Sequence, residues 1–171
     1  MKCVDLKEDV IEYCSGVAKR LGFDGMEFVC GDINAYDMTG PVHLVISLHA
    51  CDIATDIVLN KASQNNARVI LSTPCCHHEL NHKINCQSLE FITRHSMLRQ
   101  KLCDAATDAL RLLKLESEGY EVNALELIDP DDTPKNIILK AIKKDNINNE
   151  KLEKSRREYV RVRNFLLGEE V

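Results

Sequence analysis

The first half of the chain alternates short apolar runs with amphipathic segments. Apolar runs of strand length occupy 2–6, 26–30, 42–48 and 67–73. Between the first two, apolar residues recur at helical spacing, at Val10, Cys14, Val17, Ala18 and Leu21. A second helix is predicted over 53–62, with Asp52 as its cap. Strands that alternate with helices predict parallel pairing, with helices on both faces of the sheet.

The pattern changes in the second half. A long helix is predicted over 96–116, with an apolar stripe at Leu98, Leu102, Ala105, Ala106, Ala109 and Leu113. Two strand-like runs follow at 120–128 and 136–142, and the segment between them is too short for a crossover helix, so the pair must be antiparallel. The sequence thus predicts an α/β domain over 1–145 that ends in a hairpin. An amphipathic helix over 146–171 packs on this domain or extends it.

Polar clusters rich in nucleophiles follow the third and fourth apolar runs. His49, Cys51 and Asp52 come after the third run, and the segment PCCHH at 74–78 comes after the fourth. Open α/β sheets bind ligands at the carboxyl ends of their strands, so the pattern favours an enzyme site there. No metal is expected at the cysteines and histidines, because adjacent side chains on an extended segment point in alternating directions.

Composition excludes some classes of protein. The net charge is −5, so no overall basic field attracts nucleic acid, and the basic residues of the tail are interleaved with glutamates. The longest apolar runs are too short to span a membrane, and the N-terminus lacks the layout of a signal peptide. We therefore expect a cytoplasmic protein whose eight cysteines are reduced thiols.

Three motifs, in this order of elements, resemble those of class I S-adenosylmethionine-dependent methyltransferases, most closely the methyltransferase-like protein 25 type. They are HACDIATD at 49–56, PCCHH at 74–78 and the segment 129–136, which ends in TPKN. The first two are also similar to tRNA ribose 2′-O-methyltransferases that carry a Cys-Cys-His-His run. DAATD at 104–108, Arg111 and Gly119-Tyr120 extend the resemblance over nearly the whole chain.

The resemblance implies S-adenosylmethionine as cofactor and a Rossmann-like sheet. It places Asp5 at the ribose hydroxyls, Asp32 and Ile33 at the adenine, and Leu48 and His49 beside the cofactor. His49 is the first candidate for a catalytic base and Asp52 the second. The implied substrate pocket is formed by Cys51, Pro74, Cys75, Cys76, His77, Thr133, Lys135 and Asn136.

Local structure offers an alternative role for several of these residues. Asp5 and Asp52 could be acids at helix N-termini, and Asp32 could belong to an ordinary Gly-Asp turn. The segment 133–136 could serve the turn alone. Cys75 or Cys76 could carry a methyl group as a thiolate, although lining the pocket is the simpler role.

One part of the family pattern is missing. The first strand of this fold and its glycine-rich turn should precede Asp5, and none of the seven glycines forms a GxGxG run. That strand lies between the second and fourth strands of the family's sheet. We therefore expect two half-sheets with unpaired edges, association through those edges, and weak cofactor binding by what would be a fragment.

The predicted function is methyl transfer to RNA or to protein. A non-catalytic scaffold that keeps the fold is the alternative. A nicotinamide-dependent dehydrogenase would also use an acid at Asp5, but the terminal hairpin argues against it.

Overall fold

The computed structural model describes residues 1–75, 77–126, 136–146 and 148–169. They form two compact units, Met1–Thr39 and Gly40–Val171. Each unit has a sheet of its own, one with two strands and one with four. The expectation of two half-sheets is therefore confirmed.

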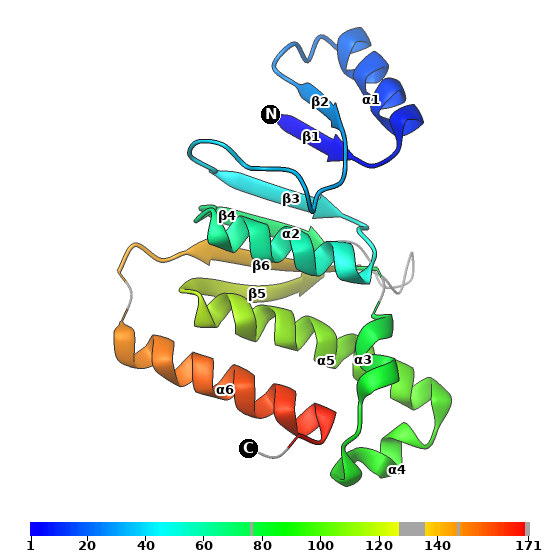
Figure 1. The fold of residues 1–171 in the computed structure, drawn as a ribbon, viewed down its shortest axis with the longest axis vertical. Helices are drawn as coiled ribbons and strands as arrows, with labels where there is room; N and C mark the ends of the chain where they lie inside the picture. Colours follow the sequence, from blue (N-terminus) through cyan, green and yellow to red (C-terminus); the bar gives the residue numbers. More distant parts are fainter. Residues whose placement is uncertain (76, 127–135, 147, 170–171) are drawn as a thin grey trace. The chain divides into compact units, whose positions relative to one another are not determined.

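The first unit is a strand, a helix and a second strand (Figure 1). Strands β1 (Lys2–Asp5) and β2 (Glu27–Cys30) pair in parallel, with Asp5 opposite Cys30 at their carboxyl ends. Helix α1 (Glu8–Arg20) connects them; it begins with acidic residues and ends with basic ones, which suits the helix dipole. Gly22, which follows the helix, has φ 74°, a conformation that glycine adopts without strain.

The second unit is built on a sheet of order β3-β4-β6-β5. Strand β3 (Leu44–Leu48) runs parallel to β4 (Val69–Thr73). Strand β6 (Ile137–Lys143) is antiparallel to both β4 and β5 (Tyr120–Glu126). The predicted parallel sheet that ends in a hairpin is confirmed.

The helices follow in the order that the sequence predicts, with a short helical insertion before the long helix. They are α2 (Asp52–Gln64), α3 (His78–Lys83), the 3-10 turn η1 (Gln87–Leu89), α4 (Glu90–Thr93), α5 (Ser96–Ser117) and α6 (Asn149–Leu167). Helix α6 packs on α5, and Asn148 caps it by accepting hydrogen bonds from two backbone N–H groups. No helix in the described part of the chain is long and apolar enough to cross a membrane.

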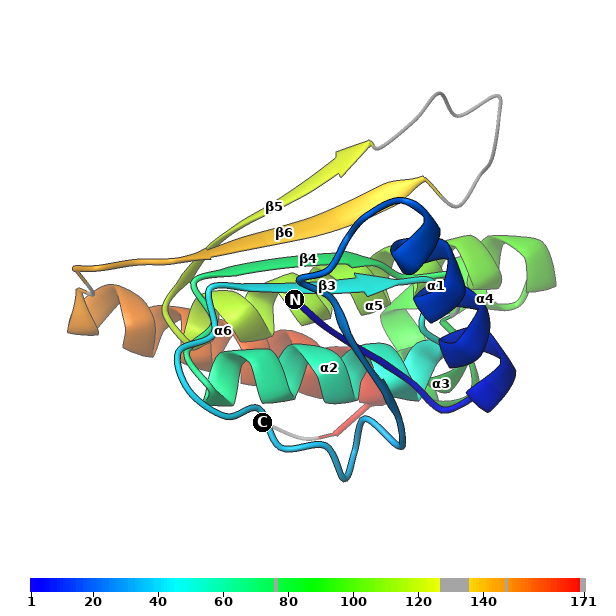
Figure 2. The same ribbon diagram turned by 90° about the horizontal axis from the view of Figure 1, so that it is seen from above.

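The core of the second unit lies on one face of its sheet. Val45, Ile70, Ala141 and Val122 lie side by side across the four strands. They pack with Leu59 and Ala62 of α2 and Leu115 of α5. Figure 2 shows α2, α5 and α6 on this side of the strands.

The opposite face of the same sheet carries exposed apolar residues. Leu44, Ile46 and Leu48 of β3 are 50%, 48% and 68% exposed. The prediction of helices on both faces is therefore wrong for this unit. Because successive right-handed crossovers run in one direction along the sheet, they place their helices on the same face.

Candidate functional site

The carboxyl ends of β3 and β4 meet at one edge of the four-stranded sheet. There the backbone N–H of His49 donates to the carbonyl oxygen of Thr73 at 3.1 Å and to its hydroxyl at 3.2 Å. His49 has φ 50°, in the left-handed region that side chains other than glycine seldom adopt. Such strain persists where the surroundings impose it, and it concentrates at functional sites. The side chain of His49 is exposed at this edge.

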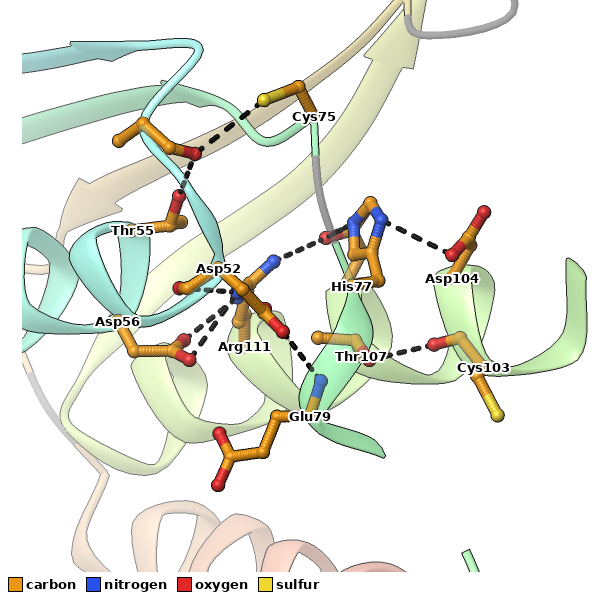
Figure 3. Close-up of polar contacts among 12 residues, drawn as sticks. Asp52, Thr55, Asp56, Cys75, His77, Glu79, Cys103, Asp104, Thr107 and Arg111 are labelled. Carbon is orange, nitrogen blue, oxygen red and sulfur yellow. Dashed lines mark hydrogen bonds and ion pairs between the residues drawn. The ribbon is translucent and has the colours of Figure 1, made fainter. Parts of the chain in front are cut away.

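Cys75 links the two loops that follow these strands. Its Sγ lies 3.6 Å from the carbonyl oxygen of His49 and 3.8 Å from that of Ala50. The Ala50 oxygen also accepts a hydrogen bond at 3.0 Å from the hydroxyl of Thr55, in α2 (Figure 3). Pro74, which precedes the cysteine, is buried. His49, Cys75 and Pro74 therefore come together as the sequence predicts, and their roles stay predictions.

Beneath these loops lies a buried ionic cluster centred on Arg111 of α5. Its guanidinium donates to Asp52 Oδ1 at 2.7 Å, Asp56 Oδ1 at 2.8 Å and Asp108 Oδ1 at 3.2 Å. The Arg111 side chain is only 4% exposed. Burial alone would lower the pKa of Arg111, but the hydrogen bond and charge of Asp56 and the charges of Asp108 and Asp52 raise it. The guanidinium thus carries a fixed positive charge among three carboxylates.

His77 extends this cluster to the loop after β4. Its Nε2 lies 2.8 Å from Asp108 Oδ1, and its Nδ1 lies 3.5 Å from Asp104 Oδ1 (Figure 3). The His77 side chain is 4% exposed. The structure therefore points the imidazole at α5 rather than at solvent, and the substrate contact predicted for His77 stays a prediction.

Asp52 is the first residue of α2 and is not its cap, which is Cys51. The cap prediction is wrong because the Asp52 carboxylate bonds other elements: Oδ1 accepts from Arg111, and Oδ2 accepts from the backbone N–H of Glu79 at 2.7 Å. Asp52 thereby joins α2, α3 and α5. Cys51 is exposed beside it.

The residues predicted to bind the cofactor's adenosine lie in the first unit. Asp5 ends β1, and Asp32 follows β2, so both stand at the carboxyl edge of the two-stranded sheet. Oδ1 of each carboxylate accepts a hydrogen bond at 2.8 Å from the backbone N–H two residues further on. Both side chains are exposed, and Ile33 beside them is half-buried.

The remaining predicted residues are only partly described. Leu48, at the end of β3, is exposed. Asn136, just before β6, is buried. Cys76, Thr133 and Lys135 lie outside the described residues. Seven cysteines fall within the described ranges and are free thiols. No group of three or more potential metal ligands is found among the described residues.

From the sequence we assigned no role to Asp104, Asp108 and Arg111, although all three belong to the family resemblance. Asp104, Asp108 and Arg111 recur at steps of four and three, and therefore share one face of α5. This spacing could have indicated a shared polar face on the helix. The apolar stripe predicted for α5 is wrong in part, because Leu98, Ala105 and Ala109 are exposed whereas Asp108 and Arg111 are buried.

Comparisons with known proteins agree with this architecture. Residues 1–83 match a family model described as a methyltransferase domain. Among solved structures, the chain is similar to 23S rRNA methyltransferase ErmE, with a TM-score of 0.52 and 11% identity. The similarity covers 95% of this chain and 59% of that one. A search of curated proteins found no match.

The chain therefore has a Rossmann-like fold similar to that of the methyltransferase ErmE, which confirms the predicted fold class. It spans 59% of the length of the ErmE structure.

Proposed function

We propose that this chain belongs to an S-adenosylmethionine-dependent methyltransferase of the methyltransferase-like protein 25 type, whose acceptor is RNA. One observation carries the proposal. His49 is held in a left-handed backbone conformation at the carboxyl end of β3, and the loop after β4 fixes it there. In a class I methyltransferase fold this edge is where an acceptor would meet the cofactor.

The residues of the first unit fit the adenosine part of the cofactor. Oδ1 of Asp5 and of Asp32 is bonded to backbone. Oδ2 of each carboxylate makes no hydrogen bond within the described residues, so it can accept one from a ligand. A carboxylate suits the ribose diol at Asp5 and the adenine amine at Asp32. Ile33 would pack on the adenine ring. S-Adenosylmethionine, when bound, would supply a methyl group already activated by its sulfonium.

His49 is the candidate base in this proposal. Its ring is exposed and makes no hydrogen bond within the described part of the chain, so a ring nitrogen can accept a proton from an acceptor hydroxyl. The backbone of His49 is fixed by Thr73, which limits where the ring can reach. Cys51, Pro74 and Cys75 would line the acceptor pocket next to it.

The buried ionic cluster has a positioning role in this proposal. Asp52 is bonded to Arg111 and to the backbone of Glu79, so both of its carboxylate oxygens are engaged. This supports His49 rather than Asp52 as the group that moves a proton. Asp52 would instead hold the start of α2, directly after the loop of His49.

A matched pair of variants tests cofactor binding. Asp32 lies at the carboxyl end of β2, whereas Asp24 lies before the start of the same strand; both are exposed. Asp32→Asn should weaken S-adenosylmethionine binding about tenfold, the loss of one charge-assisted hydrogen bond. Asp24→Asn should leave it unchanged. Isothermal titration measures both affinities on the chain extended by a glycine-rich strand and turn, which is the form expected to bind the cofactor. Equal affinities of the two variants would contradict the proposed site.

A further inference from the structure

The end of α4 and the start of α5 carry a surface whose charge is opposite to that of the whole chain. Residues 91–101, which we call the α4–α5 tip, include Arg94, Arg99 and Lys101 and contain no Asp or Glu. The chain as a whole has a net charge of −5. A basic segment without carboxylates in an acidic protein attracts an anionic partner locally.

The same segment exposes large apolar side chains. Phe91 is 62% exposed, Met97 67% and Leu98 44%. Arg94 and His95 are also exposed, and Arg94 Nε donates to His95 Nε2 at 3.2 Å. His95 occupies the N-cap position of α5, yet its ring makes no capping hydrogen bond. The tip therefore presents three planar groups, a phenyl, a guanidinium and an imidazole, close together in sequence.

The positive charges of the tip divide into an anchor and two groups that have no ion pair among the described residues. Arg99 is half-buried and donates from Nε to the carbonyl and side-chain oxygens of Asn81 at 3.0 Å, which ties α5 to α3. Arg94 and Lys101 are exposed and form no ion pair within the described residues. These two charges remain available to an external anion.

A groove continues from the tip towards α6. Thr93 and Arg99 line it from the tip, and Arg161 and Phe165 line it from α6. Phe165 is 49% exposed. Glu90 and Glu169 also line the groove, so an anion would be attracted to the tip and to Arg161 rather than to the whole channel.

We propose that the α4–α5 tip binds a single strand of RNA, with Phe91 and the Arg94–His95 pair stacking on bases and Arg94 and Lys101 contacting phosphates. Aromatic rings and guanidinium planes beside phosphate-binding cations are the combination that single-stranded RNA requires. An acidic peptide would not need the planar groups, and α4, with four residues, is too short for a membrane-surface helix. Both ribbon views place α3 and α4 towards the end at which β3 and β4 point, the side of the His49 loop (Figures 1 and 2). The inference rests on the proposed function, because it assigns a binding surface to the RNA acceptor proposed there.

The test measures binding of a fluorescein-labelled single-stranded oligoribonucleotide by anisotropy, over a range of salt concentrations and without cofactor. Arg94→Ala/Lys101→Ala should weaken binding and reduce the slope of log affinity against log salt by about 1.4, the value for two phosphate contacts on a single strand. Phe91→Ala should weaken binding roughly 5- to 100-fold, as loss of one stacked base does.

The matched control removes the same two charges elsewhere. Lys154 and Arg157 are exposed on α6 and do not line the groove. The double variant Lys154→Ala/Arg157→Ala should have nearly the same affinity for the oligoribonucleotide as the unsubstituted chain. Its slope of log affinity against log salt should also be nearly the same. Circular dichroism establishes that each variant is folded.

Three results would overturn the inference: no binding of the oligoribonucleotide by the parent chain, equal losses in the tip and control variants, or tip-dependent binding to phosphatidylserine vesicles in place of RNA. A different result would contradict the proposed function. If tip-dependent RNA binding is present but a cofactor-binding form of the protein transfers no methyl group to RNA, the methyltransferase proposal is wrong and the RNA surface stands.

Discussion

His77 Nε2 and Asp108 Oδ1 lie 2.8 Å apart, although the two residues are separated by 31 positions in the chain. Asp108 also accepts from Arg111, which in turn bonds Asp52 and Asp56. Helix α5 thus holds both the loop after β4 and the start of α2. The ionic contacts of Arg111 and the contact of His77 with Asp108 therefore all depend on this one helix.

Removal of the central cation should destabilise the second unit. Arg111→Met leaves the carboxylates of Asp52, Asp56 and Asp108 without their counter-ion, and breaking a buried ion pair in this way costs about 3–5 kcal/mol. The free energy of unfolding in urea measures the loss. Arg68→Met is the control, since Arg68 pairs with Asp145 on the surface and its loss should cost below about 1 kcal/mol. Equal losses would show that the Arg111 cluster contributes no more than a surface pair.

Loss of the His77 anchor should loosen the loop that contains Cys75. His77→Leu removes the contact with Asp108, and loss of a buried hydrogen bond to a charged group costs about 1.5–3 kcal/mol. Cys75, now held near the carbonyl oxygens of His49 and Ala50, should then be alkylated several times faster. Peptide mass spectrometry after timed alkylation measures this rate for Cys75 alone. His82→Leu, at an exposed histidine, should not change it, and an unchanged rate in His77→Leu would refute the anchoring role.

Stability should fall at alkaline pH through Tyr120. Its side chain is 1% exposed, its hydroxyl donates to the carbonyl of Ala67, and burial raises its pKa to about 12. An unfolded tyrosine ionises near pH 10, so between about pH 10 and 12 the unfolded state binds fewer protons than the folded state and stability decreases as pH rises. The free energy of unfolding should fall by about 2–3 kcal/mol across this window.

Urea unfolding at several pH values measures that slope. Tyr120→Phe should be less stable at neutral pH, because the Ala67 carbonyl loses its donor, but its stability should change less between about pH 10 and 12. The same slope in both proteins would assign the alkaline instability to other groups.

The exposed face and edge of β3 should cause self-association. Within the described chain β3 pairs with β4 alone, and its outer face carries Leu44, Ile46 and Leu48 without any charged residue. Ile46→Lys should therefore reduce association in sedimentation velocity without loss of stability. Val160→Lys changes an equally exposed residue on α6 and should have little effect. If both substitutions reduce association alike, general surface hydrophobicity and not the strand edge would be responsible.

Strand and helix order could be predicted from the sequence because the periods of apolar residues are clear. The runs that became β1, β2, β3 and β4 were predicted to within two residues of their observed ends, and the antiparallel pair β5–β6 followed from the length of its connection. The break into two sheets could be predicted only through the family resemblance, because no local pattern marks a missing central strand.

The interior of the candidate site could not be predicted in the same way. Burial of Arg111 and Asp108 contradicts their hydrophilic character. It is favourable because the two pair with each other within α5 and bond partners in other elements, Arg111 with Asp52 and Asp56 and Asp108 with His77. The backbone strain at His49 likewise depends on Thr73 and Cys75, which lie 24 and 26 residues further along the chain. Such partners are set by tertiary packing, which a single sequence does not specify.

The most direct test of the central claim is S-adenosylmethionine binding, measured by isothermal titration on two chains. One is the 171-residue chain, and the other is the same chain preceded by the strand and glycine-rich turn that the family resemblance implies. We predict micromolar binding by the extended chain, weakened by Asp32→Asn, and weak or no binding by the shorter one. A folded extended chain that does not bind the cofactor would contradict the methyltransferase assignment and favour a scaffold that retains the fold.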